Sequence, residues 1–229
     1  MIIQHKLYLR AMEKNSTLRI LCDFDGTITR ACLCDFLYKE FATCGLKFSD
    51  LWNEGKIGTK EEIESSFQFI QATREEMESA LATIEVVPGF REFYDYCRAR
   101  ELPLTIVSDG LEWAIRYVLG CMGVTDIAVM SNRIFFEPQG FRFEFPYYNA
   151  SAAQTGVCKR DIVETFKQKS ERIIMIGDGR TDFDASHLAD FVFARDALWD
   201  YCQVHHIPSR QFDNFFDILT DIQDPDSEI

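Results

Sequence analysis

The stretch Leu21-Cys22-Asp23-Phe24-Asp25-Gly26-Thr27 ends an apolar run with two acidic residues and a glycine. Two later runs end in the same Asp-Gly step, namely Ile106-Val107-Ser108-Asp109-Gly110 and Met175-Ile176-Gly177-Asp178-Gly179. Each run predicts a buried strand that breaks at a glycine. In an open α/β sheet, ligands bind at the carboxyl ends of the strands. We therefore expect three acidic strand ends to meet and form a site for a hard cation, which prefers oxygen ligands.

Composition sets limits on the partners of this protein. The chain has 229 residues, is 47% hydrophobic and carries a formal net charge of −13. A nucleic-acid-binding protein would need a basic face, so this class is not expected. A small anionic substrate stays possible, because a metal ion and one lysine can reverse the local field. The sequence leaves monomer and homodimer equally open.

Cysteine usage and hydropathy favour a cytoplasmic location. The eight cysteines include no CxxC pair, and scattered cysteines in apolar surroundings are typical of buried thiols in a reducing compartment. No apolar run is long enough to span a membrane. Residues 1–14 have neither the sustained apolar stretch nor the small-residue cleavage site of a secretory signal.

The order of elements predicts an α/β fold with a helical insertion. From residue 88 onward strand and helix patterns alternate, which indicates a parallel sheet with helices on both faces. Residues 30–87 show helical spacing alone, and Thr59-Lys60-Glu61-Glu62 looks like a capping box that opens one of these helices. We expect residues 1–29 and 88–229 to form the core. The insertion at 30–87 follows the first acidic loop, so it must sit over the strand ends as a lid.

The two acidic residues of the first run can divide acid–base work between them. Asp23 and Asp25 are two residues apart, so an extended backbone directs both carboxylates to one side, while Phe24 points into the core. A bound divalent cation would keep Asp23 ionised and able to attack phosphorus. Asp25 could then protonate the leaving oxygen and later deprotonate water.

Further chemistry-bearing residues follow in chain order. Ser108 lies after a strand and before a helix, where a hydroxyl and backbone N–H groups can hold phosphate. Lys159 opens a helix before the next strand and can supply a compact positive charge; Lys167 and Lys169 are rivals at that helix's end. Asp178 ends the next strand, and Asp182 follows four residues later.

Together these residues resemble the haloacid dehalogenase superfamily of phosphohydrolases, in the branch that contains phosphoserine phosphatase. The likeness covers the whole chain through four elements: Asp23-Phe24-Asp25-Gly26-Thr27, Ser108, Lys159, and Gly177-Asp178-Gly179-Arg180-Thr181-Asp182. It implies a Rossmann-like core, a helical cap and an aspartyl-phosphate intermediate. It also implies Mg²⁺ held by Asp23, the Asp25 carbonyl and Asp178, with Asp182 in the outer shell or orienting the lysine.

The resemblance also implies a phosphate-binding set and shows three departures. The expected phosphate-binding residues are Thr27, Ser108, Asp109, Gly110 and Lys159. Because the second carboxylate, Asp25, is present, the chain is similar to the phosphatases or phosphotransferases rather than the dehalogenases of the superfamily. Asp109 stands where relatives usually carry glycine, Gly179 where they carry serine, and a cysteine-rich stretch is reduced to Cys158. These departures leave the chemistry intact and bear on the substrate.

The cap is expected to select the leaving group. Its candidate contact residues are Asp35, Phe36, Trp52 and Phe67. No arginine lies between Arg30 and Arg74, although a phosphoserine carboxylate would need a cation. An aromatic, weakly charged cap suits a small, partly apolar phosphate monoester. Candidates are the methylthio enol phosphate of methionine salvage, pyridoxal phosphate and phosphocholine-like esters.

Two alternatives remain open from the sequence. Within enzymes, the chain could be a phosphoserine phosphatase or a phosphotransferase. In another class, it could be a non-catalytic regulatory protein that binds a phosphate ligand on the same fold. The complete set Asp23, Asp25, Ser108, Lys159 and Asp178 favours catalysis, because a binding module needs no acid–base residue.

Overall fold

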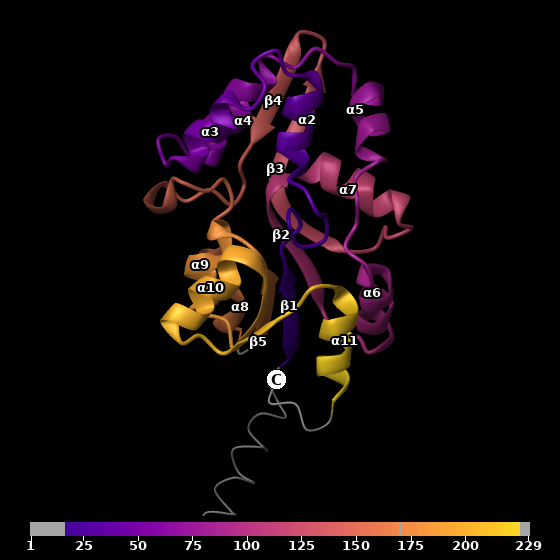
Figure 1. Cartoon of the computed structure of the whole chain (residues 1–229), viewed down its shortest axis with the longest axis vertical. Coiled ribbons are helices and arrows are strands. Elements are labelled where there is room, and N and C mark those ends of the chain that lie inside the picture. The colour runs from indigo at the N-terminus through magenta and orange to yellow at the C-terminus, as the bar shows by residue number, and fades with distance from the viewer. Residues whose placement is uncertain (1–16, 170, 225–229) are drawn as a thin grey trace, which may run out of the picture.

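A mostly parallel sheet forms the centre of the molecule (Figure 1). The computed structural model describes residues 17–169 and 171–224, so the expectations for residues 1–14 and for the last residues of the acidic tail lie outside it. In the described ranges the sheet has the order β4-β3-β2-β1-β5-β6-β7. The strands are β1 (Leu18–Cys22), β2 (Leu104–Leu111), β3 (Ala128–Glu137), β4 (Gly140–Glu144), β5 (Arg172–Gly177), β6 (Phe191–Ala194) and β7 (Ser209–Gln211). The expected α/β class is confirmed, with β3–β4 as an antiparallel hairpin.

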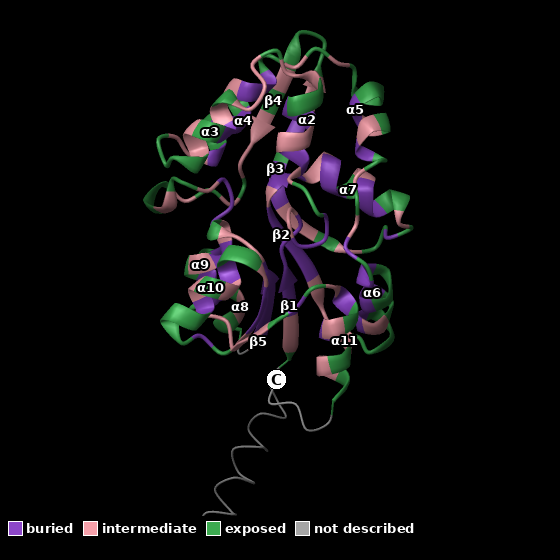
Figure 2. Ribbon diagram, viewed as in Figure 1, coloured by how far each residue is buried: buried purple, intermediate pink, exposed green. Residues whose placement is uncertain are grey.

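Helices cover both faces of this sheet because its strands are apolar on both sides. Ile20 and Cys22 of β1 belong to one buried cluster, and Leu21 between them belongs to another, as the alternation of a strand requires. Figure 2 shows the central strands as buried, between layers of helices. The first cluster takes in α6 (Phe90–Ala99), α7 (Glu112–Cys121) and α11 (Phe215–Gln223); the second takes in α8 (Lys159–Lys167), α9 (Phe183–Ser186) and α10 (Asp196–His205).

The strand order reverses beside β1, and this reversal positions the site. The chain proceeds from β1 through β2 to β3 on one side, then returns to add β5, β6 and β7 on the other. Strand β1 pairs in parallel with both β2 and β5, so their carboxyl ends lie at the same edge. Neighbouring connections leave in opposite directions there, which opens a crevice suited to a ligand.

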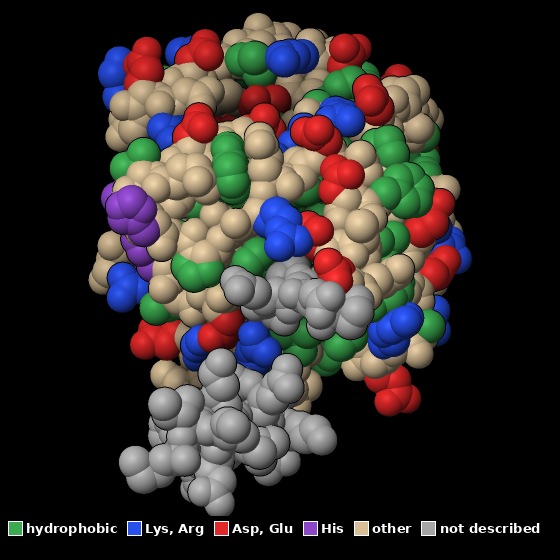
Figure 3. Space-filling view, turned by 60° about the horizontal axis from the view of Figure 1, so that its bottom comes forward, with side chains coloured by type: hydrophobic (Ala, Val, Ile, Leu, Met, Phe, Trp, Pro, Cys, Tyr) green, Lys and Arg blue, Asp and Glu red, His purple; other side chains and the backbone are tan. Residues whose placement is uncertain are grey.

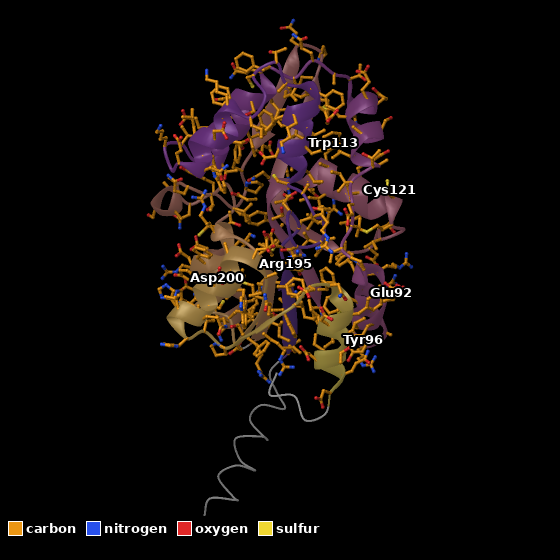
Figure 4. The ribbon with its side chains drawn as sticks, in the orientation of Figure 1. Glu92, Tyr96, Trp113, Cys121, Arg195 and Asp200 are labelled. Carbon is orange, nitrogen blue, oxygen red and sulfur yellow. The ribbon has the colours of Figure 1, made fainter. Side chains whose placement is uncertain are left out.

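Residues 30–87 carry four helices that lie above this edge, beside the far end of the β3–β4 hairpin (Figure 1). They are α2 (Leu33–Phe41), α3 (Lys47–Asn53), α4 (Thr59–Phe67) and α5 (Arg74–Leu81). Phe67 packs edge-on against Phe141 and Phe143 of the hairpin, with ring centroids 5.2 Å apart in both pairs. Trp113 of α7, labelled in Figure 4, donates from its indole nitrogen to Glu78 of α5 at 2.7 Å. The hairpin and α7 thus hold the helical insertion against the core.

The residue pattern also predicts a strand at 127–130, a hairpin at 134–145 and a frayed tail from Asp221 onward. These expectations and the capping role of Thr59 differ from the structure. A single ten-residue strand, β3, replaces the expected strand at 127–130 and a separate hairpin arm from 134, because its far half pairs with β4. Thr59 is not a helix cap: Gly58 occupies that position, and the Thr59 hydroxyl bonds to Asp109 instead. The tail expected to fray from Asp221 is helical up to Gln223, and Asp221 pairs with Arg210 at 2.6 Å.

One face of the molecule carries charges of both signs (Figure 3). In the view of Figure 3, acidic and basic side chains are interspersed, and the histidines gather at one side. His187, which directly follows α9, and His205 at the end of α10 pack around Tyr201. Within residues 17–169 and 171–224, no helix is both long enough and apolar enough to cross a membrane.

Candidate active site

Asp23 and Asp25 open the site at the end of β1. The Asp23 N–H still donates to Ile176 of β5 at 2.9 Å, which extends the strand by one residue. Phe24 is fully buried, so the two carboxylates on either side of it face the other way, into a cavity of about 200 Å³. Asp23 accepts from the Phe24 N–H and Asp25 from the Leu33 N–H, both at 2.7 Å. These backbone donors fix one oxygen of each carboxylate.

Lys159 joins the carboxylates of two different loops. Its Nζ lies 2.8 Å from Asp23 Oδ2 and 2.7 Å from Asp182 Oδ1, with only 2% of its side chain exposed. Burial acts to lower the pKa of Lys159, but the charges of Asp182 and Asp23 outweigh burial and raise the pKa above its ordinary value. The lysine is therefore a fixed positive charge. Its rival Lys167 pairs with Asp190 instead.

A compact carboxylate cluster lies next to this lysine. Ligand oxygens of Asp23, Asp178 and Asp182 all fall within 4.8 Å of one another. Burial, together with the negative charge of Asp182, raises the pKa of Asp178 to about 7. Gly26 makes the close approach possible: its φ is +79°, and a Cβ there would lie 2.2 Å from an Asp178 oxygen.

The donor set fits a hard divalent cation. Buried carboxylates this close repel one another, and a cation between them would relieve that repulsion. Asp182 has its oxygens already occupied, one by Lys159 and the other by the N–H groups of Asp178 and Gly179 at 3.2 and 3.3 Å. Asp23 and Asp178 line the cavity and Asp182 does not, so the first two are the candidates for direct carboxylate ligands, with Asp182 behind them.

Ser108 lies opposite Asp25, within β2 rather than after it. The register of β2 with β3 shifts between Val107 and Leu111, so the backbone is irregular at this point. The Ser108 hydroxyl accepts from the Gly110 N–H at 3.0 Å and lies 3.5 Å from Asp25 Oδ2. Burial raises the pKa of Asp25 to about 6, although the Leu33 N–H opposes the shift. Asp25 is thus poised to hold a proton near neutral pH.

Thr27 has a different role from the expected one. It is fully buried, and its hydroxyl donates to Asp178 Oδ1 at 2.8 Å. The hydroxyl therefore positions a metal-ligand candidate and is not free for phosphate.

Asp109 connects the phosphate-binding region to the cap. One of its oxygens accepts from the N–H groups of Gly156 and Val157 at 2.7 Å each, and the other from the Thr59 hydroxyl at 2.5 Å. The Trp52 indole in turn donates to the Thr59 hydroxyl at 3.0 Å. The side chain of Asp109 is therefore committed to this contact, which leaves its backbone as the part that faces a phosphate.

The cap supplies part of the cavity wall, and the aromatic expectation holds for one residue. Of the four candidates, Asp35 and Trp52 line the cavity, whereas Phe36 does not and Phe67 is buried in the cap core. Sequence reasoning missed several lining residues: Cys32, Cys34, Ser49, Asn53, Thr59, Glu62, Ile63, Arg180 and Thr181. A signal for Glu62 exists, since it lies three residues after Thr59 and one before buried Ile63, on the inner face of α4.

Comparisons with known proteins agree with this geometry. The family model of haloacid dehalogenase-like hydrolases matches residues 20–187. A 2-hydroxy-3-keto-5-methylthiopentenyl-1-phosphate phosphatase of Exiguobacterium sibiricum is 32% identical over 215 residues, which is 90% of this chain and 97% of the relative. The enzyme of the same name from Bacillus pumilus is 29% identical, with 87% and 88% covered. The segments 174–178 and 193–196 predict a likeness to this enzyme, and the comparison confirms it.

A solved structure shows the same fold. The substrate-bound complex of a phosphoserine phosphatase superposes with a TM-score of 0.67 at 18% identity, covering 90% of this chain and 98% of that one. The family model spans most of the chain and includes every acidic strand end of the site. The chain therefore belongs to the haloacid dehalogenase-like hydrolases.

Proposed function

We propose that this protein is a Mg²⁺-dependent phosphatase that hydrolyses a small phosphate monoester through a phosphorylated Asp23. One observation carries the proposal: Asp23, Asp25 and Asp178 line a single cavity, with Lys159 buried against Asp23. A nucleophile, an acid–base group, a cation site and a fixed positive charge are the groups that phosphoryl transfer requires.

In the first step, an Asp23 oxygen attacks phosphorus and the bond to the leaving oxygen breaks. Asp25 donates its proton to that oxygen, so the leaving group departs as an alcohol. The raised pKa of Asp25, about 6, supports this role, because it brings the group close to neutral pH, where it can both give up and take up a proton. Lys159 balances the negative charge beside Asp23.

In the second step, Asp25 accepts a proton from water while the water oxygen attacks the phosphorus of phospho-Asp23. The bond between phosphorus and the Asp23 oxygen breaks, which releases inorganic phosphate and restores the carboxylate. The Ser108 hydroxyl and the N–H groups of the irregular segment after it are suited to hold the phosphoryl oxygens.

Mg²⁺ bound by Asp23, the Asp25 carbonyl and Asp178 would supply positive charge for the phosphoryl oxygens. Asp182 then acts indirectly, by holding Lys159 and the backbone of the loop after β5. Thr27 orients Asp178 through its hydroxyl.

We also propose that residues 1–29 and 88–229 form the catalytic core and residues 30–87 the lid. The lid excludes water by closing over the cavity, which its helices line through Trp52, Thr59 and Glu62. The free state of all eight cysteines supports a reducing, cytoplasmic compartment. The relatives named above act on a methylthio enol phosphate, and this remains the leading substrate, with phosphoserine as the runner-up.

Asp23→Asn is the test of the function. We expect turnover of acetyl phosphate or p-nitrophenyl phosphate with Mg²⁺ to fall by at least about a thousandfold, since the amide is no nucleophile. Asp184→Asn, at an exposed position of α9, is the matched control and should retain full activity. Turnover that survives Asp23→Asn would refute the assignment of the nucleophile. A wild-type protein that binds phosphate esters without turnover would support the regulatory alternative.

A further inference from the structure

The cap wall of the cavity contains a buried carboxyl group without a cation. Glu62 of α4 is 7% exposed and lines the cavity together with Asp23 and Asp25. Its Oε1 accepts from the Ser49 hydroxyl at 3.1 Å. Among the described residues, no lysine or arginine forms an ion pair with Glu62. Burial raises its pKa to about 8, in spite of the hydrogen bond from Ser49.

A carboxyl group in this position is costly to the folded protein. Buried ionised groups are normally paired, and a carboxyl that has no cation loses its hydration without compensation. Glu62 accepts a hydrogen bond from Ser49, and the buried Tyr38 hydroxyl is its other polar neighbour. The Glu62 carboxyl has no cation partner among the described residues and lies on the wall of the cavity, so it is available to bind a substrate.

The rest of the cap wall narrows the chemistry of that partner. Asp35 also lines the cavity. So do Cys34, which precedes Asp35, and Ile63, which follows Glu62, and both are buried and weakly polar. The cavity's one arginine, Arg180, comes from the core: its guanidinium lies 4.6 Å from the Trp52 ring centroid and donates to the Asn53 carbonyl. A carboxylate on the leaving group would face Asp35, and Glu62 as well once Glu62 is ionised, and would be repelled. A hydroxyl group would donate to Glu62, and an ammonium group would pair with the ionised form.

We propose that Glu62, held by Ser49, selects phosphate esters whose leaving group carries a hydrogen-bond donor, and rejects those that carry a carboxylate. This inference rests on the proposed phosphatase function and gives it a substrate class. A hydroxyl and an ammonium group share this donor chemistry. The methylthio enol phosphate belongs to the class through its hydroxyl, and phosphoserine is disfavoured by its carboxylate.

The experiment uses matched esters of graded chain length: ω-hydroxyalkyl, ω-aminoalkyl, plain alkyl and ω-carboxyalkyl phosphates. Turnover by the wild-type protein, Glu62→Gln, Glu62→Leu and the control Glu64→Gln is compared. Glu64 is exposed on the same helix, so its substitution should change nothing. For the wild-type protein, we expect kcat/KM for one donor-bearing series to exceed that for the plain alkyl series by at least about tenfold, and the carboxyalkyl series to be the poorest.

The variants Glu62→Gln and Glu62→Leu show whether the donor on the leaving group is a hydroxyl or an ammonium group. Glutamine keeps an acceptor oxygen and removes the charge that Glu62 carries above a pH of about 8. At that pH it should preserve turnover of a hydroxyl ester and reduce that of an ammonium ester by about tenfold or more. Glu62→Leu should abolish the preference for both hydroxyalkyl and aminoalkyl phosphates by raising KM for these esters, while turnover of plain alkyl phosphate persists.

Three results would overturn the proposal. They are a wild-type protein that does not prefer donor-bearing esters, one that turns over carboxyalkyl phosphate best, and a Glu62→Leu variant that slows every ester equally. In all three cases turnover that depends on Asp23 would still stand. Loss of the proposed function is recognised separately, because the wild-type protein would then turn over none of the esters and Asp23→Asn would change nothing.

Discussion

The contact between Asp109 and Thr59 should contribute measurably to stability, because it joins the cap to the core through a half-buried carboxylate. Thr59 is 5% exposed and donates to Asp109 at 2.5 Å, while the other Asp109 oxygen holds two backbone N–H groups of the loop before α8. The perturbation is a double-mutant cycle of Asp109→Ala and Thr59→Val. The cycle isolates the energy of the one bond that the two side chains share.

The expected size follows from the bonds that are lost. A hydrogen bond to a charged group contributes about 1.5–3 kcal/mol. Asp109→Ala removes the three bonds of 2.5–2.7 Å and a longer one of 3.5 Å from the Asn132 amide. Because the cavity admits water to the freed donors, we take a loss of about 4.5 kcal/mol, the lower limit of the sum for the three short bonds. Thr59→Val removes one of the three, for a loss of about 1.5–3 kcal/mol. The double variant should therefore be within about 1 kcal/mol of Asp109→Ala alone.

Urea unfolding followed by circular dichroism measures these free energies, provided that the four proteins share one m value. Thr83→Val is the matched control: its hydroxyl bonds to the Ala80 carbonyl at 2.8 Å within the exposed end of the cap. This control should be nearly neutral and additive with Asp109→Ala. Losses that simply add for Asp109 and Thr59 would mean that the bond contributes nothing, and would refute the reasoning.

Further outcomes are expected from the charged groups of the cavity. Lys159→Met should destabilise the protein by about 3–5 kcal/mol in urea, because it leaves the carboxylates of Asp23 and Asp182 facing each other without a cation; an unchanged midpoint would contradict their pairing. Mg²⁺ at about a hundred times its Kd should stabilise the wild-type protein by about 2.7 kcal/mol in a thermal-shift titration, and Asp178→Asn should lose that gain; an equal gain in the variant would place the ion elsewhere. Because burial raises the pKa of Glu62 to about 8 from an ordinary value of 4.5, folding takes up a proton between these pH values, and the associated stability is lost as the pH rises through this window. Glu62→Gln should therefore lose less stability than the wild-type protein on going from acid to alkaline pH across that window, by at most about 5 kcal/mol. Parallel losses would show that Glu62 does not titrate there.

Much of the fold was predictable because its signals are local. An apolar run that ends at an acidic residue and a glycine specifies a strand and its end without reference to the rest of the chain, as at Asp23 and Asp178. The wrong predictions concern segments whose structure depends on a residue that is distant in the chain. Strand β3 continues past the expected break because Arg133 to Glu137 pair with β4, and Thr59 leaves its cap role because Asp109 offers a charged acceptor.

The candidate site divides in the same way. Its core motif residues lie in segments that the sequence marks. The structure brings Asp23, Asp25, Asp109 and Asp178 to one cavity, with Ser108 next to Asp25 and Lys159 paired with Asp23. The cap residues could not be chosen from the pattern, because aromatic side chains at helical spacing serve the cap core as readily as a ligand. Phe67 serves the core, packed against the hairpin, while Trp52 lines the cavity.

By itself, then, the sequence determined the layered sheet, the place of the insertion and the acid pair, because strand periodicity and glycine turns act over a few residues. Three contacts became visible in the tertiary structure alone. The Thr27 hydroxyl donates to Asp178, Asp109 accepts from Thr59 of the cap, and Glu62 lines the cavity with no lysine or arginine paired to it among the described residues. Burial and pairing of a charged group depend on residues that are distant in the chain. They are fixed only when the helices of the insertion pack over the strand ends.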